Sequence, residues 1–588
     1  MLPSQFNTGI AMNISRIFKS FCESTSLHGY SYLFIATSVV GKVFFALVIV
    51  SLTCIGAVFL ALNCANYSKS TLVTTIETNT APLSEATFPS ITVCNFNQLE
   101  ASYLRDIGIH GKQELKELLV KRYVKGHEKP FTEREETLFA PVQDVLDDQE
   151  YDPFFEGRQW CRNLFIHSQF ENLSLPWSSM KEFEEHEIGA WFYGTDSGSC
   201  CFLSPHNDLV YDSPDLGFSS ESAKHGKSKG LKILLDIEQF NYGHVLGQSA
   251  GLKLALHHYL DKPMMQFSSH DITIGSETQI NIKPVVTVTT NEAIEILSPD
   301  KRNCYVDSEV NLTILRYEDG YRYEMNNCLI DEGILEIYWQ CRCAPLLVLI
   351  DDNDPYFDLL SYCYGQNLHC ANEIMKIMGN LFEDQDNITE HLKVQEAIDN
   401  PHKIGNITRP AKKSCLPRCD MQEYNTAMSF AQYPPDEGFF EQHYFCYVAS
   451  HILQVTCTSK SRKYFLEKKH PNLCKVLTDF EQFFGNESDC VNWPKPFFKI
   501  FDEENQTLTE EMQKYGKRNL ALVNVFFQSP YMTKMKRDLE MTLTDFIAST
   551  GGLLGLYLGF SFVSLFEIFF WCFNCCSCKK RSIADLRG

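Results

Sequence analysis

The sequence lacks the short motifs by which several enzyme classes are recognised. Its 588 residues contain no His-Glu-x-x-His zinc motif, no phosphate-binding P-loop and no glycine fingerprint of a dinucleotide-binding fold. The stretch Thr195–Cys200 resembles the nucleophile loop of trypsin-like proteases only superficially, because no Ala-x-His-Cys context precedes it. The neighbouring His257 and His258 would point to opposite faces of a strand, which makes them a poor metal pair. We expect no catalytic residue, no cofactor and no metal site.

An excess of basic residues is also missing. The chain has 74 Asp and Glu residues against 52 Lys and Arg residues, which gives a formal net charge of −22. A strongly acidic protein repels nucleic acid and attracts cations. We therefore expect no nucleic-acid partner, and we expect cations to gather near this protein.

Long apolar runs are scarce, and both lie near the ends of the chain. Val43–Leu62 is an uncharged run of twenty residues, and Phe546–Phe573 is interrupted only by Glu567. Each is long enough for a helix that crosses the hydrocarbon core, which takes roughly 20 residues. The first run starts well inside the chain and has no small-x-small cleavage site in a suitable position. We therefore interpret it as a retained span rather than as a signal peptide.

The charges that flank the two runs predict how the chain is oriented. Residues 1–42 carry three basic side chains against one acidic one, and residues 574–588 carry four against one. The positive-inside tendency places both segments in the cytoplasm. The predicted division in the plasma membrane is a cytoplasmic segment 1–42, a span 43–62, an extracellular domain 63–545, a span 546–573 and a cytoplasmic tail 574–588.

Two features of residues 63–545 agree with an extracellular location. Sixteen of the 23 cysteines lie between Cys94 and Cys490, an even number that suits disulfides. Residues 63–545 also hold six Asn-x-Ser/Thr acceptors for glycosylation, with a further one at Asn66 close to the first run. The six are Asn172, Asn311, Asn387, Asn406, Asn486 and Asn505.

The secondary-structure pattern of this large domain is mixed and rich in strands. Strand patterns cover residues 230–237, 251–257, 271–282 and 519–528, and helical periodicity covers Gln113–Tyr123. The stretch Pro434–Lys517, with four cysteines and clustered aromatic residues, has no clear pattern. Because a domain of this size is too large for one simple core, we expect a disulfide-rich α+β fold with several subdomains.

Five features spread along the chain carry a resemblance to a known family. They are the pair His28-Gly29, the stretch Phe88–Asn95 (FPSITVCN), an array of eight cysteines between Cys304 and Cys419, the glycine-spaced run Gly551–Ser561, and Glu567. Together they resemble the degenerin/epithelial sodium channel (DEG/ENaC) family, which includes the acid-sensing ion channels. The resemblance implies a membrane protein that assembles as a trimer, with two transmembrane helices, a β-rich palm, and helical finger and thumb regions in each subunit.

The resemblance also implies roles for single residues. Gly559, Phe560 and Ser561 correspond to the Gly-x-Ser selectivity filter, where small residues let three helices approach and a helix break lets carbonyls replace part of an ion's water. Phe560 is bulkier than the residue of the best-known relatives. His28 and Gly29 correspond to a gating motif. The pore and gate residues are Asp545, Ala548, Gly552, Gly555 and Glu567. Ordinary helix packing is the alternative explanation of the glycine spacing.

The cysteine array corresponds to the laddered thumb of the family. By that resemblance the pairs are Cys304–Cys419, Cys328–Cys415, Cys341–Cys370 and Cys343–Cys363. Where many relatives have a further rung, this chain has Glu332 and Lys413, for which we predict an ion pair. The pairing of the other extracellular cysteines stays open: Cys94, Cys161, Cys200 and Cys201 form two bridges, and four more lie in Pro434–Lys517.

The implied function is a sodium-preferring cation channel that conducts passively and is blocked by amiloride. Protons, a peptide or mechanical force would open it, or it would be constitutively active, as a homo- or heterotrimer that contacts membrane lipid. Acid-sensing relatives carry a His pair shortly before the Phe-Pro signature. Residues 77–87 contain no histidine, which weakens the case for proton gating, although clustered carboxylates also titrate.

Two rival classes of two-span protein remain. An ATP-gated trimeric channel lacks the Phe88–Asn95 and Gly559–Ser561 elements. A receptor or ectoenzyme without a pore leaves Glu567 unexplained, because an acidic residue inside a span is costly and usually functional.

Overall fold

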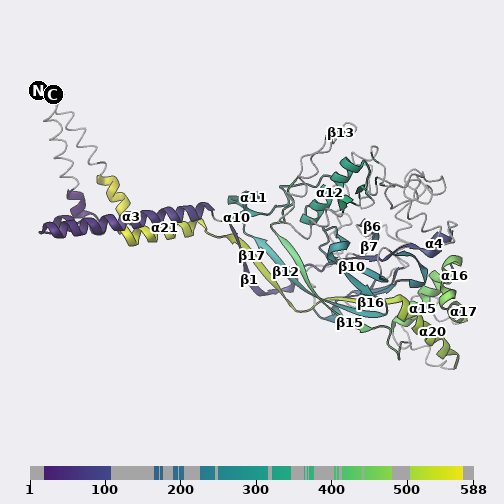
Figure 1. The fold of residues 1–588 in the computed structure, drawn as a ribbon. Helices are drawn as coiled ribbons and strands as arrows, with labels where there is room; N and C mark the ends of the chain where they lie inside the picture. Colours follow the sequence, from purple (N-terminus) through teal and green to yellow (C-terminus); the bar gives the residue numbers. More distant parts are fainter. Residues whose placement is uncertain are drawn as a thin grey trace. The chain divides into compact units, whose positions relative to one another are not determined.

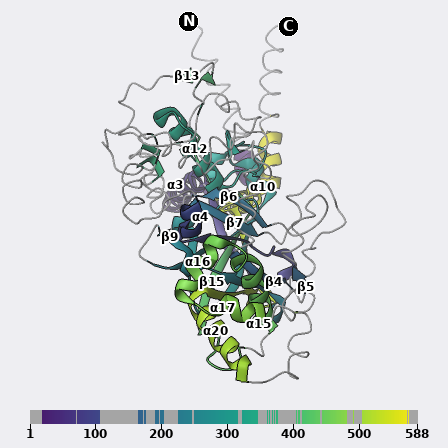
Figure 2. The same cartoon turned by 90° about the vertical axis from the view of Figure 1, so that its right-hand side faces the viewer.

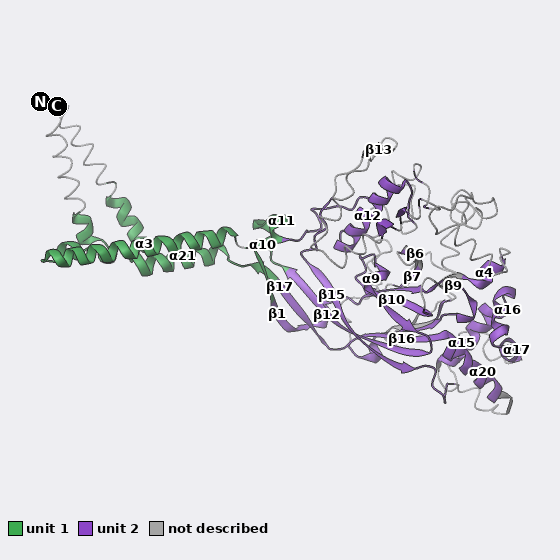
Figure 3. Ribbon diagram, in the orientation of Figure 1, with its two compact units in different colours: residues 1–75, 289–302, 537–588 green, residues 76–288, 303–536 purple. Residues whose placement is uncertain are grey.

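The computed structural model describes most of the chain outside a few long segments. The described residues are 19–69, 71–106, 164–170, 173–175, 190–195, 198–203, 225–245, 249–315, 321–345, 413–439, 443–479 and 503–571, with short pieces between 360 and 408 and residues 490 and 573. They form two compact units, coloured separately in Figure 3. Unit 1 comprises residues 1–75, 289–302 and 537–588, and unit 2 comprises residues 76–288 and 303–536.

Unit 1 contains the apolar helices. After the short α2 (Tyr32–Ile35), helix α3 (Val39–Lys69) extends beyond the apolar run at both ends and lies beside α21 (Leu543–Leu558) (Figure 1). Helix α3 is long and apolar enough to cross a membrane by itself. Helix α21 and the following helix Phe562–Trp571 pass the same test together, and they are bent by 66° with respect to each other. Two short helices, α10 (Asn291–Ile296) and α11 (Pro299–Arg302), complete the described part of this unit.

The main scaffold of unit 2 is an eight-stranded sheet. Its strand order is β1-β17-β12-β16-β8-β4-β5, with β15 paired to β12. The strands are β1 (Leu72–Pro82), β4 (Phe165–Phe170), β5 (Leu173–Leu175), β8 (Leu231–Asp236), β12 (Ser276–Thr289), β15 (Met421–Gln432), β16 (Leu520–Phe527) and β17 (Tyr531–Leu539). Burial alternates along most of β12, as expected for a strand with one face on the core. Residues 271–282, expected as one strand, are two, because a turn at Gly275 with φ +73° separates β11 from β12.

The Phe88–Asn95 stretch supplies the central strand of a second sheet. The order is β11-β10-β2-β7-β6, and every residue of β2 (Ser90–Asn95) is buried. The others are β6 (Ala190–Thr195), β7 (Gly198–Leu203), β10 (Gly251–His257) and β11 (Ser269–Thr273). A disulfide joins Cys94 on β2 to Cys200 on β7. Cys201 is also disulfide-bonded, and Cys161 lies outside the described residues. Residues of both sheets, including Ile91 and Val525, share one core.

Helix α12 (Met325–Cys341) organises the cysteine ladder. The structure joins Cys304 to Cys419, Cys328 to Cys415, Cys341 to Cys370 and Cys343 to Cys363. These are the four pairs that the resemblance implies. The predicted ion pair has a different acidic partner, because Nζ of Lys413 lies 3.9 Å from Oδ2 of Asp331 rather than against Glu332. One residue further along a helix points about 100° away, so Glu332 lies on another face of α12.

The segment Pro434–Lys517, for which the sequence showed no clear pattern, is mostly helical where it is described. It contains α15 (His443–His451), a π-helical turn (Ile452–Thr456), α16 (Lys460–Lys469), α17 (Leu473–Asp479) and α20 (Glu503–Asn519). These helices gather together in Figures 1 and 2. Disulfides Cys446–Cys490 and Cys457–Cys474 fasten them around a core that they share with strands β4, β8 and β16. The helix expected at Gln113–Tyr123 lies outside the described residues.

Candidate functional site

The predicted filter Gly559-Phe560-Ser561 is the point at which a long apolar helix breaks. Helix α21 ends at Gly559, which has φ +66°, and the next helix begins at Phe562. The amide of Gly559 donates to Gly555 O over 3.0 Å, and the amide of Phe560 donates to Leu554 O over 3.2 Å. Both bonds close the end of α21 around a glycine in the left-handed conformation, which is a common way for a helix to end. The break leaves backbone carbonyls of the following residues without the helical partner they would otherwise have, which is the chemistry that an ion-coordinating segment needs.

The predicted gating motif lies directly against this break. The amide of His28 donates to Leu558 O over 3.0 Å. A β-carbon built on Gly559 would lie 2.4 Å from Cδ2 of His28, so no other residue fits at position 559 without displacing the ring. Gly29 has φ +86°, and a β-carbon there would lie 3.1 Å from Cγ1 of Ile49. The two predicted motifs, more than 500 residues apart in sequence, therefore form one structural unit.

Glu567 is held by the same N-terminal segment. Its Oε2 accepts hydrogen bonds from Thr25 Oγ1 at 3.1 Å, Ser26 N at 3.1 Å and Ser26 Oγ at 3.2 Å. The fully buried Ser564 completes the cluster, because its hydroxyl lies 2.6 Å from Ser26 Oγ and 3.2 Å from Ser561 Oγ. Hydroxyl groups thus connect Ser561, the last residue of the predicted filter, to the N-terminal segment close to Glu567.

Sequence reasoning missed Thr25, Ser26 and Ser564. The first two precede His28 in a run of small polar residues, Ser24-Thr-Ser. That run was a visible signal, since hydroxyl groups next to an apolar segment need partners. Nothing in the spacing indicated Glu567 as the partner.

The other predicted pore and gate residues lie along one face of α21. At about 100° per residue, Asp545, Ala548, Gly552 and Gly555 share this face. Asp545 forms a capping box with Thr542, because its carboxylate accepts the Thr542 amide at 3.2 Å and its own amide donates to Thr542 Oγ1 at 3.1 Å. A β-carbon at Gly552 would meet no described atom within 4 Å. Among the described residues this face of α21 is therefore open at Gly552, whereas a β-carbon at Gly555 would lie 3.8 Å from Phe560 O.

The roughly opposite face of α21 packs on α3. Tyr67 stacks on Phe546 with 4.5 Å between ring centroids, and Phe59 stacks on Tyr557 with 5.7 Å between them. Gly56 faces Tyr557, whose Cβ would lie 3.2 Å from a β-carbon at position 56. The helix pair within the chain thus uses aromatic residues as its contact and leaves the glycines for other contacts.

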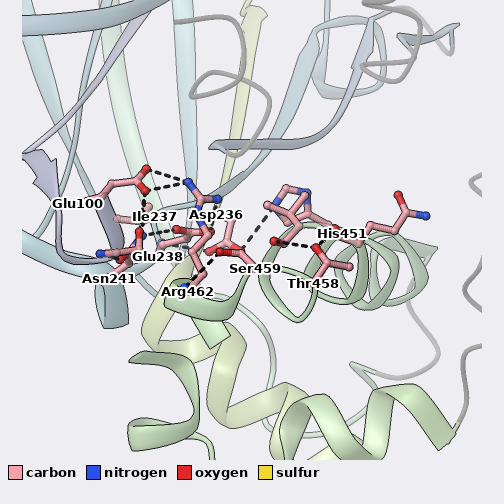
Figure 4. Close-up of polar contacts among 12 residues, drawn as sticks. Glu100, Asp236, Ile237, Glu238, Asn241, His451, Thr458, Ser459 and Arg462 are labelled. Carbon is pink, nitrogen blue, oxygen red and sulfur yellow. Dashed lines mark hydrogen bonds and ion pairs between the residues drawn. The ribbon is translucent and has the colours of Figure 1, made fainter. Parts of the chain in front are cut away.

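Unit 2 contains a second unusual cluster, a buried arginine among three carboxylates (Figure 4). Arg462 of α16 lies 2.8 Å from Glu100 Oε2 and 3.2 Å from Glu238 Oε1. Glu100 ends β3 (Asn97–Glu100), and Asp236 ends β8. Oδ2 of Asp236 accepts the hydroxyl of Tyr515 at 2.5 Å and lies 3.9 Å from His451 Nε2.

Burial controls the protonation of this cluster. Loss of solvent, and after it the nearby Glu238 carboxylate, raise the pKa of Asp236 to about 8. Burial also raises the pKa of Glu238. Burial by itself lowers the pKa of Arg462, but Glu238 and Glu100 outweigh it and keep the guanidinium charged. The cluster therefore fastens α16 to the sheet scaffold through one permanent cation, while the Asp236 carboxyl keeps its proton at neutral pH.

The remaining predicted positions carry no further chemistry where they are described. Asn311 is exposed, Asn505 lies in α20, and Asn172, Asn387, Asn406 and Asn486 lie outside the described residues. His257 is a buried structural residue that is 2.8 Å from Thr92 Oγ1. Among the residues that the structure describes, no three His, Cys, Asp or Glu side chains come together in a way that could hold a metal ion.

Comparison with known proteins extends over nearly the whole chain. A sequence model of the family described as "Amiloride-sensitive sodium channel" matches residues 21–571. Pickpocket protein 28 of Drosophila melanogaster is 18% identical over 97% of this chain and 80% of its own length. Acid-sensing ion channel 2 of Rattus norvegicus is 20% identical over 97% of this chain and 88% of its own length. The sodium channel protein Nach of Drosophila melanogaster is 23% identical over 56% of this chain and 63% of its own length.

Proposed function

Because this chain belongs to the amiloride-sensitive sodium channel family, which is a family of ion channels and not of enzymes, we propose that it is one subunit of a trimeric, sodium-preferring cation channel. The observation that carries this proposal is the break of the second apolar helix at Gly559 with His28 seated on it. A broken helix inside a membrane is tolerated only where it is covered by protein or lines a water-filled path. The break at Gly559 and its contact with His28 therefore favour a pore over a helix that only anchors the chain in the membrane.

The two faces of α21 support a pore made mainly by this helix. The face that carries Phe546 and Tyr557 is used by α3 of the same chain. The face that carries Ala548, Gly552 and Gly555 has only small side chains and is open at Gly552 among the described residues, so copies of α21 from other subunits would fit there around a central path. Asp545 at the outer end of this face would concentrate cations at the mouth.

Selection among cations would take place at Gly559, Phe560 and Ser561. Carbonyl groups released by the break and the hydroxyl of Ser561 are hard oxygen ligands that replace part of the hydration shell of Na⁺. Glu567 would supply negative charge six residues further along, and its hydrogen bonds to Thr25 and Ser26 fix the position of that charge.

We propose the predicted topology for the mature channel in the plasma membrane. The spans are 43–62 and 546–573, with residues 63–545 outside and both termini inside. The exposed apolar side chains of α3, such as Leu47, Val50 and Leu62, would then contact lipid. Asn311 remains an exposed acceptor for glycosylation under this topology.

The same proposal includes the stimulus that opens the channel. The candidates are protons, a peptide and mechanical force, and constitutive activity is the alternative. The buried cluster around Asp236 takes up protons near neutral pH, so it favours a pH-dependent response of some kind. The family name and the relatives favour block by amiloride.

The test is whole-cell current from cells that express the full chain alone, with Na⁺ replaced by K⁺, pH stepped and amiloride applied. An inward current that is larger in Na⁺ and falls with amiloride supports the proposal and a homotrimer. If co-expression with a related subunit is needed, the heterotrimer follows. Absence of current from the chain, from such a co-expression and from a variant with a bulky residue at Ala548 contradicts the proposal and favours a two-span protein without a pore.

A further inference from the structure

One polar side chain is buried in the middle of the apolar contact between α3 and α21. Asn63 is 7% exposed, whereas the preceding Leu62 is 53% exposed. Its Nδ2 donates to Thr550 Oγ1 at 2.9 Å, and its Oδ1 accepts from Ser549 Oγ at 3.3 Å. Both ends of one amide therefore bind two consecutive hydroxyl groups of the facing helix.

Asn63 lies at the centre of a regular contact. Phe59, Asn63 and Tyr67 are spaced four residues apart, so they share one face of α3. Phe59 and Tyr67 stack on Tyr557 and Phe546 of α21 on either side of the amide. The aromatic pairs supply packing, and the amide supplies the directional contact between them.

The geometry of these bonds shows what the amide specifies. A Ser or Thr hydroxyl in a membrane helix readily bonds a carbonyl of its own helix one turn back, so Ser549 and Thr550 do not depend on Asn63 for a partner. A single polar group in an apolar helix contact instead fixes the register and rotation of the two helices. The rotation of α21 about its axis matters here, because the predicted gate residue Ala548 directly precedes Ser549.

We propose that Asn63 is a positioning residue for the outer part of the pore, which sets the rotation of α21 and thereby the orientation of Ala548 and Gly552. This inference rests on the proposed channel function. While the amide holds Ser549 and Thr550 toward α3, the glycine face of α21 stays turned away from α3. Movement of α21 about its axis at this level requires both hydrogen bonds to break. Asn63 therefore controls how often the outer pore opens and leaves ion selection at Gly559–Ser561 unchanged.

The first readout needs no current. The full chain carrying Ala548→Cys is expressed in cells and labelled with a membrane-impermeant maleimide, and the labelling rate is corrected for the chain without this substitution. In this background we expect Asn63→Leu to raise the rate about three- to tenfold, the range that one side-chain hydrogen bond between membrane helices supports. The isosteric Thr550→Val should raise the labelling rate as well. The double variant should exceed the larger single variant only slightly, because Asn63→Leu already removes the hydrogen bond to Thr550.

The matched control is Thr53→Ala. Like Asn63→Leu it removes a polar group from α3, but Thr53 is exposed and its hydroxyl donates to Ile49 O of its own helix. The labelling rate should stay unchanged. The exchange Asn63→Thr with Thr550→Asn restores an amide opposite a hydroxyl and should return the rate toward that of the parent, which a general loss of folding would not do.

The second readout separates opening from conduction. In channels that give current, Asn63→Leu should change the open probability while the reversal potential in mixed Na⁺ and K⁺ stays at the parent value. Equal labelling rates for the parent, Asn63→Leu and Thr550→Val, at equal amounts of protein on the cell surface, overturn the inference. A shifted reversal potential also overturns it. A chain without current leaves the labelling result decisive for Asn63 and counts against the proposed channel function alone.

Discussion

A β-carbon at position 559 would lie 2.4 Å from Cδ2 of His28, so the glycine of the predicted filter and the histidine of the predicted gating motif are in contact. The contact exists because Gly559 adopts a left-handed backbone conformation that turns the chain out of α21. It links an N-terminal segment to the selectivity filter that we propose for the pore. A substitution of either residue should therefore alter the conformation of the other.

We predict that Gly559→Ala abolishes sodium current without removing the protein from the cell surface. An alanine there would be pushed against the imidazole and would also pay about 1–2 kcal/mol for the positive φ. Adding His28→Ala removes the clash but not the backbone strain, so the double variant should recover part of the current. Gly551→Ala is the control on the same helix, because a β-carbon there meets no described atom within 4 Å. Full current from Gly559→Ala would contradict the contact.

Glu567 provides a second prediction about the pore. Glu567→Gln removes the negative charge, yet its side-chain oxygen still accepts from Thr25 and Ser26. We expect the single-channel sodium conductance to fall at least about twofold while the N-terminal segment stays in place. Glu567→Leu removes the charge and the hydrogen bonds together, so it should also reduce the open probability. Single-channel recording separates the two effects, and equal conductance in Glu567→Gln and the parent would show that the charge does not face the ion path.

The sequence predicted the elements of this site but not their contacts. The glycine spacing and Glu567 indicated a functional helix, and the resemblance supplied His28. The bonds from Thr25 and Ser26 to Glu567 span 542 and 541 residues, respectively. A contact over that distance is decided by how the chain folds back on itself, and no periodicity reports it. Asn63 was missed for the same reason, since its partners lie 486 and 487 residues away.

In the fold, too, local patterns were predicted from the sequence and long-range contacts were not. The strand patterns at residues 230–237, 251–257 and 519–528 correspond to β8, β10 and β16, because alternation and β-branched residues are local signals. The helices of Pro434–Lys517 were not readable. Four cysteines allow three pairings, and the helices there depend on disulfides and on contacts with β8 and β16 rather than on strong periodicity. The role of Asp236 and Glu238 appeared only once Arg462 was placed beside them.

The pKa of Asp236 makes a prediction about stability and pH. In the folded protein this carboxyl keeps its proton up to a pKa of about 8, whereas the unfolded chain releases it near the ordinary pKa of 3.8. Between these values the folded state binds more protons, so the stability that the group contributes falls as pH rises from about 4 to 8 and is lost above 8. The melting temperature of the full chain in detergent should accordingly fall from pH 6 to pH 8.5.

The variant Asp236→Asn tests this assignment. Its amide cannot ionise but can still accept the hydroxyl of Tyr515, so its melting temperature should fall less over the same pH range. Asp436→Asn is the control, because Asp436 is exposed and its hydrogen bond with Lys517 lowers its pKa. If the parent and Asp236→Asn lose the same number of degrees, Asp236 does not carry the proton.

Removal of Arg462 should destabilise unit 2 strongly. The guanidinium is the partner of both Glu100 and Glu238, and removing one member of a buried ion pair leaves an uncompensated charge, which costs about 3–5 kcal/mol. We expect Arg462→Met to lower the melting temperature of the full chain by many degrees, and Lys460→Met, an exposed change on the same helix, to stay within about 0.5 kcal/mol of the parent. The loss should be smaller at pH 6 than at pH 8.5, because protonation of Asp236 removes one of the negative charges that Arg462 no longer balances. An equal loss at both pH values would mean that Arg462 acts through packing alone, so the pH difference is the measurement that identifies its electrostatic role.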